Sequence, residues 1–125
     1  MASSSEPRYR TFKADGAITQ FSFVKYGTDT DHVAQAGANE KCRGIAMTAA
    51  TAAEDKVEVA LPGGGGKLKL AETVVGGNYL TSTAAGLGEV VDAADEPVGA
   101  RAENGGVAND VIAVEVLDFK ASASD

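Results

Sequence analysis

The sequence predicts an all-β fold, a small β-barrel or β-sandwich of short strands with an extended N-terminal arm. Two observations predict it. Fifteen glycines stand against three prolines in 125 residues, and together with many Ser, Thr, Asn and Asp residues they indicate frequent chain reversals. Between these turn residues lie short segments, most of them four to eight residues long, which suit the strands of a small sandwich or barrel.

Residues 17–26 and eight segments further along the chain are expected to form these strands. Residues 8–13 and 17–26 flank a turn signal at residues 14–16, as expected for a hairpin or for an arm that enters the first strand. Within the second segment, Phe21 and Phe23 fall on one face of a period-two strand, which we expect to face the core. The other eight segments are residues 32–36, 43–48, 56–61, 67–71, 79–82, 89–92, 98–102 and 111–119.

The chain length fits one domain with a modest core. The apolar residues are mainly Ala and Val, with four Phe, three Tyr and no Trp, so this core is expected to be thin. The alanine-rich residues 48–53 lack an apolar stripe and are too few for a stable helix, which predicts a loop or a single turn. We therefore expect an N-terminal arm over residues 1–16 and a β-rich domain over residues 17–125.

Part of the sequence recurs at an offset of 55 residues. Residues 43–47 (RGIAM) and 53–59 (AEDKVEV) have counterparts in residues 98–102 (VGARA) and 108–114 (ANDVIAV). Each copy has the pattern strand, small-residue turn, strand, with Asp closing the turn. The pattern indicates a duplicated hairpin unit, and the alternative is chance similarity in a chain rich in Ala, Val and Gly. The identical pairs are Gly44/Gly99, Ala53/Ala108, Asp55/Asp110 and Val59/Val114.

The formal net charge of -7 argues against nucleic acid as a partner, because binding to phosphates requires Lys and Arg. The charge is uneven, since residues 1–15 have a net charge of +1 and residues 16–125 one of -8. The polar start MASSSEPRYR is not a secretory signal, and the uncharged residues 73–88 are too rich in Gly, Thr, Ser and Asn for a membrane span. The single cysteine, Cys42, excludes an internal disulfide and favours synthesis in a cytoplasm.

Two short motifs resemble ligand sites but depart from them. Residues 62–67 (PGGGGK) are flanked by Leu61 and Leu68 where a phosphate-binding loop needs Gly and Ser or Thr, so a hairpin connection is expected. Asp29 and Asp31 begin like a calcium loop, but the following residues supply neither a third oxygen ligand nor the Gly for the bend. We expect an exposed turn there, and no metal or cofactor.

Candidate catalytic residues are few. His32 is the single histidine, which leaves no second imidazole for a metal site. Cys42 lies nearby in sequence between Lys41 and Arg43, whose charges would favour a thiolate, so a small Cys–His hydrolase is one alternative. No third residue is evident that would orient such a pair, and a structural cysteine is favoured. Residues 95–96 (DE) predict a solvated turn, and the chain is not expected to be an enzyme.

The N-terminal segment mixes cations with aromatic side chains. Arg8, Tyr9, Arg10 and Phe12 suit stacking on nucleic acid or contact with an acidic protein surface, and the acidic body of the chain disfavours nucleic acid. An unstructured, solubilising tail is the alternative for this segment.

A series of short segments follows one order through most of the chain. These segments are residues 23–27 (FVKYG), 33–36 (VAQA), 43–46 (RGIA), 55–61 (DKVEVAL), 74–82 (VVGGNYLTS), 88–91 (GEVV), 98–102 (VGARA) and 110–117 (DVIAVEVL). Over roughly residues 20–118, this order resembles the small capsid decoration, or head cement, proteins of tailed bacteriophages. The glycine run at residues 63–66 is longer than this resemblance leads us to expect, and the residues before Phe21 match no motif of the family.

The resemblance implies a compact β-barrel or β-sandwich, usually a homotrimer on the outer surface of the virion. It sits at three-fold or quasi-three-fold positions of the capsid, where it ties neighbouring subunits of the major capsid protein together. No catalytic residues come with the family. Such a protein would be synthesised in the host cytoplasm, with no nucleic-acid or membrane partner.

We expect the N-terminal arm to attach the protein to the shell, because an extended segment can add a strand to an exposed sheet edge. The capsid-binding residues predicted in this way are Arg8, Tyr9, Arg10, Phe12 and Lys13. The alternative function is a β-rich surface module that binds a host receptor or glycan, although glycan sites usually carry exposed Trp or Tyr and this chain has no Trp.

Overall fold

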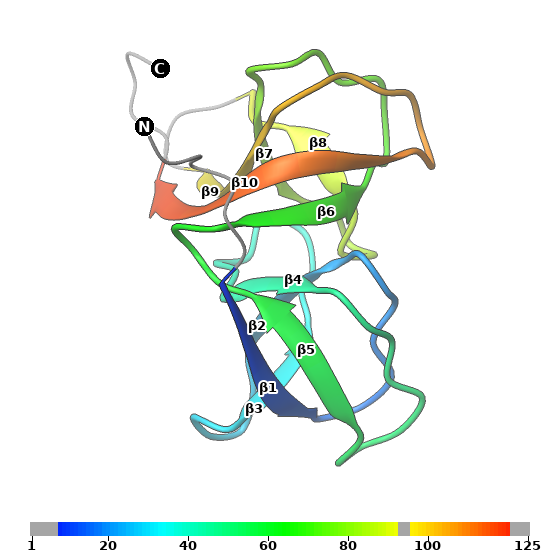
Figure 1. Ribbon diagram of the computed structural model, residues 1–125, viewed down its shortest axis with the longest axis vertical. Helices are drawn as coiled ribbons and strands as arrows, with labels where there is room; N and C mark the ends of the chain where they lie inside the picture. The colour runs from blue at the N-terminus through cyan, green and yellow to red at the C-terminus, as the bar shows by residue number, and fades with distance from the viewer. Residues whose placement is uncertain (1–7, 93–95, 121–125) are drawn as a thin grey trace.

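The computed structural model describes residues 8–92 and 96–120, and every regular element among them is a β-strand. The all-β prediction is confirmed. The strands form two five-stranded units, stacked along the long axis of the molecule (Figure 1). They are β1 (Tyr9–Ala14), β2 (Phe23–Tyr26), β3 (His32–Gln35), β4 (Gly44–Ala46), β5 (Lys56–Ala60), β6 (Gly65–Lys69), β7 (Tyr79–Ser82), β8 (Gly88–Val90), β9 (Pro97–Ala102) and β10 (Val111–Lys120).

The first unit, residues 8–61, is a closed barrel with the strand order β1-β3-β2-β4-β5. β1 pairs with β5 along most of its length and with β3, in parallel, at Lys13 and Ala14. Because side chains alternate between the two faces of a strand, every second residue points into the barrel. The interior consists of Phe12, Ala14, Ile18, Val24, Val33, Ala46, Ala50, Val57 and Val59.

The second unit, residues 64–120, is a sheet with the order β6-β10-β9-β7-β8. A parallel bridge between Leu70 and Gly88 joins the end of β6 to the start of β8. This bridge gives the second unit the same circular strand order as the first, with β6 to β10 in the places of β1 to β5. Its interior includes Leu68, Leu70, Val74, Leu80, Ala102, Ile112 and Val114.

The duplication predicted from the sequence is therefore confirmed, and it extends over the whole five-stranded unit. The isolated bridge between Ile18 and Ala50 recurs between Val74 and Gly106, 56 residues later at both ends. Backbone hydrogen bonds from Ile18 to Ala50 and from Val74 to Gly106, at 2.9 and 2.8 Å, repeat as well. Two copies of one supersecondary unit have thus kept their pairing although most of their side chains differ.

The turn before the last strand of each unit repeats in detail. Glu54 and Asn109 both have a positive φ, of 72° and 73°, a conformation that few non-glycine residues adopt. The next residue is Asp55 in one copy and Asp110 in the other, and each carboxylate accepts hydrogen bonds from backbone N–H groups of its own turn. These two Asp residues are a pair that the sequence repeat identified, and they close the turn as expected.

The offset of 55 residues applies to β5 and β10 but not to β4 and β9. Val24 pairs with Gly44, and its counterpart Leu80 pairs with Ala100. Gly44 therefore corresponds to Ala100 and not to Gly99, so the sequence match at this pair was one residue out of register. The reason is a loop that is one residue shorter in the second unit, between β9 and β10.

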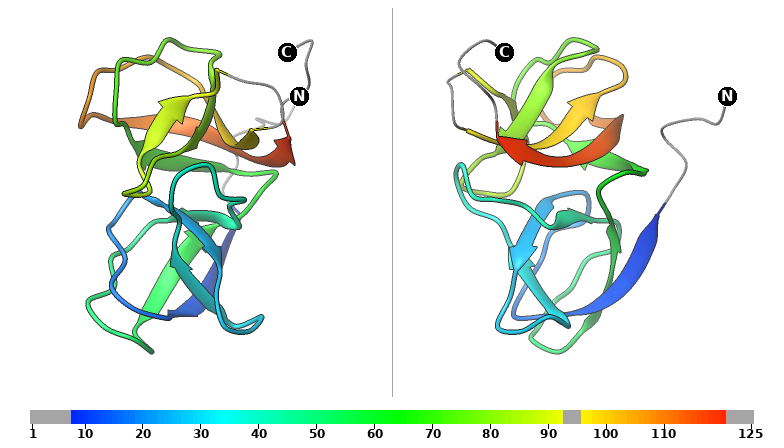
Figure 2. Two further views of the ribbon diagram at one scale, coloured as in Figure 1. Left: turned by 180° about the vertical axis from the view of Figure 1, so that it is seen from behind. Right: turned by 90° about the vertical axis from the view of Figure 1, so that its left-hand side faces the viewer.

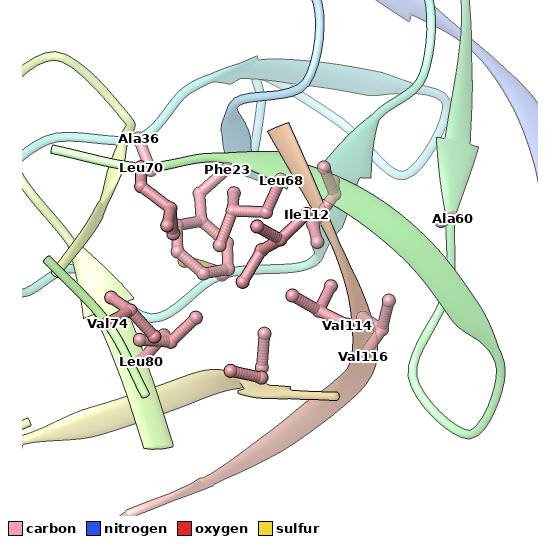
Figure 3. Packing of buried hydrophobic residues seen from close by; sticks show 14 residues of the cluster. Phe23, Ala36, Ala60, Leu68, Leu70, Val74, Leu80, Ile112, Val114 and Val116 are labelled. Carbon is pink, nitrogen blue, oxygen red and sulfur yellow. The ribbon is translucent and has the colours of Figure 1, made fainter. Parts of the chain in front are cut away.

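The outer face of the first unit is buried by the second. Phe23, Ile45 and Ala60 form one cross-strand row on β2, β4 and β5, and all three are 0% exposed. They belong to the same apolar cluster as the interior of the second unit. Figure 3 shows Phe23 beside Leu68 and Leu70, so this row of the first unit belongs to the core of the second.

Glycines on the second unit permit this contact. A Cβ atom added at Gly99 would lie 2.6 Å from Phe23 Cε1, and one at Gly66 would lie 3.1 Å from the Cβ of Ala60. The end of the second unit that receives the first is therefore lined by residues without side chains. We call the surface at Gly66 and Gly99 the glycine end.

The expected strand over residues 17–26 forms only over Phe23–Tyr26. Phe21 has a φ of 62°, which ends the extended conformation, and its side chain is half-buried. The prediction that Phe21 and Phe23 share a core face is wrong, because this left-handed residue breaks the alternation. Phe23 faces the second unit while Val24 points into the barrel, so β2 is covered on both sides.

The predicted N-terminal arm differs from the structure in one important respect. Residues 9–14 of the segment 1–16 are strand β1 of the barrel, paired with β5 over five residues. Its alternate residues Phe12 and Ala14 are 2% and 0% exposed. Apolar burial and strand pairing thus make these residues part of the first unit. Residues 1–7 lie outside the described part of the chain.

Substitution of Gly99 tests the contact between the units. We expect Gly99→Ala to lower the free energy of unfolding by about 1–3 kcal/mol, as is typical of overpacked cores, because its methyl group would collide with the Phe23 ring. Gly16→Ala is the matched control, since nothing lies within 4 Å of a Cβ there. Urea unfolding of the two variants measures the difference, and equal losses would contradict the proposed packing constraint.

Candidate functional site

β1 runs along the outer side of the first unit (Figure 2). Tyr9 is 48% exposed, and Thr11 and Lys13 are exposed as well, because these three alternate with residues that face inward. Arg8 is exposed at the start of the strand, and its Nη1 donates to the carbonyl oxygen of Pro62 at 3.2 Å. Two cations and a tyrosine are therefore displayed on one side of the barrel.

The same strand has an incompletely paired edge. β5 covers one edge from Tyr9 to Lys13, whereas β3 reaches the other edge only at Lys13 and Ala14. The remaining part of that edge, from Tyr9 to Phe12, has no neighbouring strand among the described residues. A strand edge of this kind presents backbone N–H and C=O groups that another chain can pair with.

Two shallow hollows flank β1. One, of about 260 Å³, lies where the two units meet and is lined by Tyr9, Met47, Gly65 to Lys67, Glu103 and residues 113–114. The other, of about 170 Å³, lies along the incompletely paired edge and is lined by Thr11, Phe12, Lys13, Asp31 and Lys56. We call the exposed residues Arg8, Tyr9, Thr11 and Lys13, with this edge, the β1 face.

Phe12 does not belong to the β1 face. Its ring is 2% exposed and lies in the barrel interior, so the prediction of direct capsid contact by Phe12 is corrected. The alternation of the strand also turns Arg10 toward the barrel end, where its guanidinium lies 4.9 Å from the Phe12 ring centroid. The structure therefore divides Arg8, Tyr9, Arg10 and Lys13 between two surfaces and buries Phe12.

Two residues that sequence reasoning missed complete the second surface. The guanidinium of Arg43 stacks over Phe12 at 4.6 Å and over Tyr26 at 4.5 Å, and Arg10 lies 3.8 Å from Asp31. Pairing of β2 with β4 brings these positions together, and no local sequence signal predicted it. We call Arg10, Tyr26 and Arg43, stacked above Phe12, the arginine end of the first unit.

His32 lies between two carboxylates at the start of β3. Its Nδ1 is 2.7 Å from Asp29 and its Nε2 is 2.8 Å from Glu54. The hydrogen bond to Asp29, followed by that to Glu54, raises the pKa of His32 to about 9, and the same contact lowers the pKa of Asp29. The imidazolium thus connects the loop that contains Asp29 with the loop that contains Glu54. Asp29 also accepts a hydrogen bond from the N–H of Asp31 within its own turn.

Cys42 and His32 have separate partners. The Cys42 thiol is 5% exposed in the core of the second unit and donates to the carbonyl oxygen of Glu40 at 3.4 Å. Burial, followed by the charges of Asp118 and Glu40, raises the pKa of this thiol to about 12. A thiol of this kind is not ionised at neutral pH and is a poor nucleophile.

The glycine run at residues 63–66 connects the two units. Gly63 has a φ of 93°, and its N–H donates to the carbonyl oxygen of Val116 at 2.9 Å. β6 begins at Gly65, two residues before the expected strand. Across the described residues there is no group of three or more His, Cys, Asp or Glu side chains placed to hold a metal ion. No helix suited to crossing a membrane occurs in the described part of the chain.

Comparison with known proteins relates the fold to a solved structure and not to a known sequence family. No protein-family model and no curated sequence matches the chain. The structure is similar to the head fiber gp8.5 N base of bacteriophage phi29, with a TM-score of 0.71 and 15% sequence identity. The likeness covers 87% of this chain and 92% of that chain. At this identity it shows a shared fold that includes both five-stranded units.

The His32 clamp predicts a pH dependence of stability. Its pKa is 6.5 in the unfolded chain and about 9 in the folded one, so its stabilising contribution is complete below pH 6.5 and is lost as the pH rises through 9. We expect the free energy of unfolding of the wild type to fall over this range and that of His32→Gln to fall much less. Chemical denaturation at several pH values measures this, and parallel curves would refute the clamp.

Proposed function

We propose that this chain is a structural protein of a bacteriophage virion, which binds the outer surface of the capsid and has no catalytic role. The observation that carries this proposal is the likeness, over most of both chains, to the head fiber base of phage phi29. The resemblance of residues 20–118 to capsid decoration proteins supports the same conclusion from sequence. The fold likeness and the sequence resemblance both point to proteins of phage heads.

The proposed role is reinforcement of the shell. A homotrimer at a three-fold or quasi-three-fold position would bridge neighbouring subunits of the major capsid protein. Each bridge adds interface area that must be lost before the shell opens, and many copies act together against internal DNA pressure. This work requires rigid attachment surfaces and no active site.

The β1 face is the proposed attachment surface. It combines the cations Arg8 and Lys13 with the half-exposed ring of Tyr9, a composition suited to an acidic protein surface with apolar patches. The open edge of β1 can also accept a strand from a capsid subunit, in which case backbone hydrogen bonds would supply affinity. The five residues predicted from sequence are thereby reduced to three, with Thr11 added.

Deletion of the N-terminal segment does not test this attachment, because β1 is a strand of the barrel. Exposed side chains of the β1 face are the better targets. Lys69 offers a matched control, since it holds the position in the second unit that Lys13 holds in the first. Both are lysines on the first strand of a unit, and only one lies on the proposed surface.

We expect the double substitution Tyr9→Ala and Lys13→Glu to weaken binding to capsids at least tenfold, or by about 1.4 kcal/mol, because it removes an aromatic contact and reverses a charge. Lys69→Glu should bind as the wild type does. Co-sedimentation of purified protein with expanded capsids of the phage that encodes the chain measures both. Equal weakening by the two variants would exclude the β1 face, and binding of wild type to a glycan or cell surface but not to capsids would favour a receptor-binding module.

A further inference from the structure

The contact between the two units leaves a matching pair of surfaces uncovered. Within the chain, the row Phe23, Ile45 and Ala60 of the first unit packs on the glycine end of the second. Because the units share one fold, the second unit has a face equivalent to the buried row of the first. The first unit likewise has an end equivalent to the glycine end of the second. Within residues 8–92 and 96–120, no other part of the chain covers either of these counterparts.

The arginine end of the first unit is the counterpart of the glycine end. Arg10 holds the place of Gly66, because each pairs with the equivalent valine on the last strand of its unit. Arg43 holds the place of Gly99, because each precedes the residue that pairs with the second strand. In the second unit this end is buried against the first unit and carries glycines. In the first unit the equivalent end is exposed and carries arginines at the same positions.

The counterpart of the buried row lies on the second unit. Tyr79 pairs with Arg101 on β9, and Arg101 pairs with Glu115 on β10, as Phe23, Ile45 and Ala60 pair across β2, β4 and β5. Tyr79 is 36% exposed, and it meets Phe119, 38% exposed, edge to face at 5.4 Å. We call Tyr79, Arg101, Glu115 and Phe119 the aromatic face.

The two uncovered surfaces are complementary at the positions equivalent to Ala60 and Gly66. Inside the chain, Ala60 lies against Gly66. The residues in these two places on the uncovered surfaces are Glu115 and Arg10. A small apolar pair is thereby replaced by a carboxylate and a guanidinium, which form strong, charge-assisted hydrogen bonds.

The second equivalent pair is complementary as well. Inside the chain, the ring of Phe23 lies against Gly99. The residues in these two places on the uncovered surfaces are Tyr79 and Arg43. An arginine opposite a tyrosine ring suits a cation–π contact, the interaction that Arg43 already makes with Tyr26. Both internal pairs are apolar, and both counterparts combine an arginine with a side chain that attracts it.

We propose that the aromatic face of one copy docks on the arginine end of a second copy, repeating between chains the contact that joins the two units within a chain. Glu115 then meets Arg10, and Tyr79 meets Arg43. The contact between copies would use the same pairs of positions as the contact inside the chain. The two units would lie further apart, because arginine side chains are longer than glycine. The present partners, Asp31 of Arg10 and Arg101 of Glu115, become members of the same ionic network.

This contact is head-to-tail, since it uses two different surfaces of each copy. Such contacts give closed rings when the rotation between copies closes, and filaments when it does not. The inference rests on the proposed function in one respect, because it names the surfaces that would build the homotrimer. It leaves the β1 face free for the shell.

Single charge reversals test the contact. We expect the wild type to self-associate in sedimentation equilibrium, and Arg10→Glu and Glu115→Arg each to weaken that association at least tenfold. Tyr79→Ser removes the ring without altering an ion pair, and it should also weaken association at least tenfold. This variant keeps the test available if a charge reversal unfolds the protein. Val111→Ser, at an apolar residue 42% exposed outside both surfaces, should associate as the wild type does.

A mixing experiment distinguishes head-to-tail contact from a symmetric one. Neutral variants are mixed here, because Arg10→Ala keeps an intact aromatic face, Glu115→Ala keeps an intact arginine end, and the two altered surfaces cannot pair by charge. An equimolar mixture of these two variants should form a species of two copies, twice the 12.6 kDa chain mass, and nothing larger. The double variant, with both reversals in one chain, should regain association. A wild type that stays monomeric up to about 1 mM, the weakest range usually counted as binding, would overturn the proposal, as would variants that all associate normally.

Capsid co-sedimentation of the same variants separates this inference from the proposed function. A wild type that binds capsids while showing no contact between these surfaces overturns the self-association alone. A wild type that self-associates as described but fails to bind capsids overturns the proposed function and leaves the contact between copies standing.

Discussion

The close packing of Phe23 against Gly99 is the contact on which the rest of the structure depends. A small chain with few aromatic residues has little apolar volume, and this contact adds Phe23, Ile45 and Ala60 of the first unit to the core of the second, while the barrel interior remains a separate cluster. Burying an aromatic ring contributes about 1.5–3 kcal/mol, but only if the facing backbone comes close. Glycine at that place is therefore a condition for the close contact between the two units.

Duplication explains how one sequence can supply both a core and two outer surfaces. In the first unit, the row on β2, β4 and β5 is apolar and is covered, while the equivalent row on β7, β9 and β10 carries Tyr79, Arg101 and Glu115. The equivalent ends of the two units differ in a similar way. The buried end of the second unit carries Gly66 and Gly99, and the exposed end of the first carries arginines. The fold fixes where these positions are, and the side chains determine which contact is internal.

Much of the fold could be predicted from turn residues and strand-length segments. Most strands were placed to within two residues, and the repeat at Asp55 and Asp110 identified the duplication. The break at Phe21 could not be predicted, because a left-handed φ on phenylalanine has no sequence signal. The place of β1 in the barrel could not be predicted either, because its burial depends on pairing with the distant β5. For the candidate site, sequence found the exposed Arg8, Tyr9 and Lys13 but placed Phe12 wrongly on the surface and missed Arg43 and Tyr26, which only the pairing of β2 with β4 brings to Phe12.

The central claim is that this two-unit β protein attaches to a phage shell through one side of its first unit. Cryo-electron microscopy of expanded capsids incubated with the purified protein tests it most directly. The account predicts added density at three-fold or quasi-three-fold positions, resolved into two five-stranded units with β1 turned toward the capsid. Shells without added density, or density in which β1 faces solvent, would contradict it.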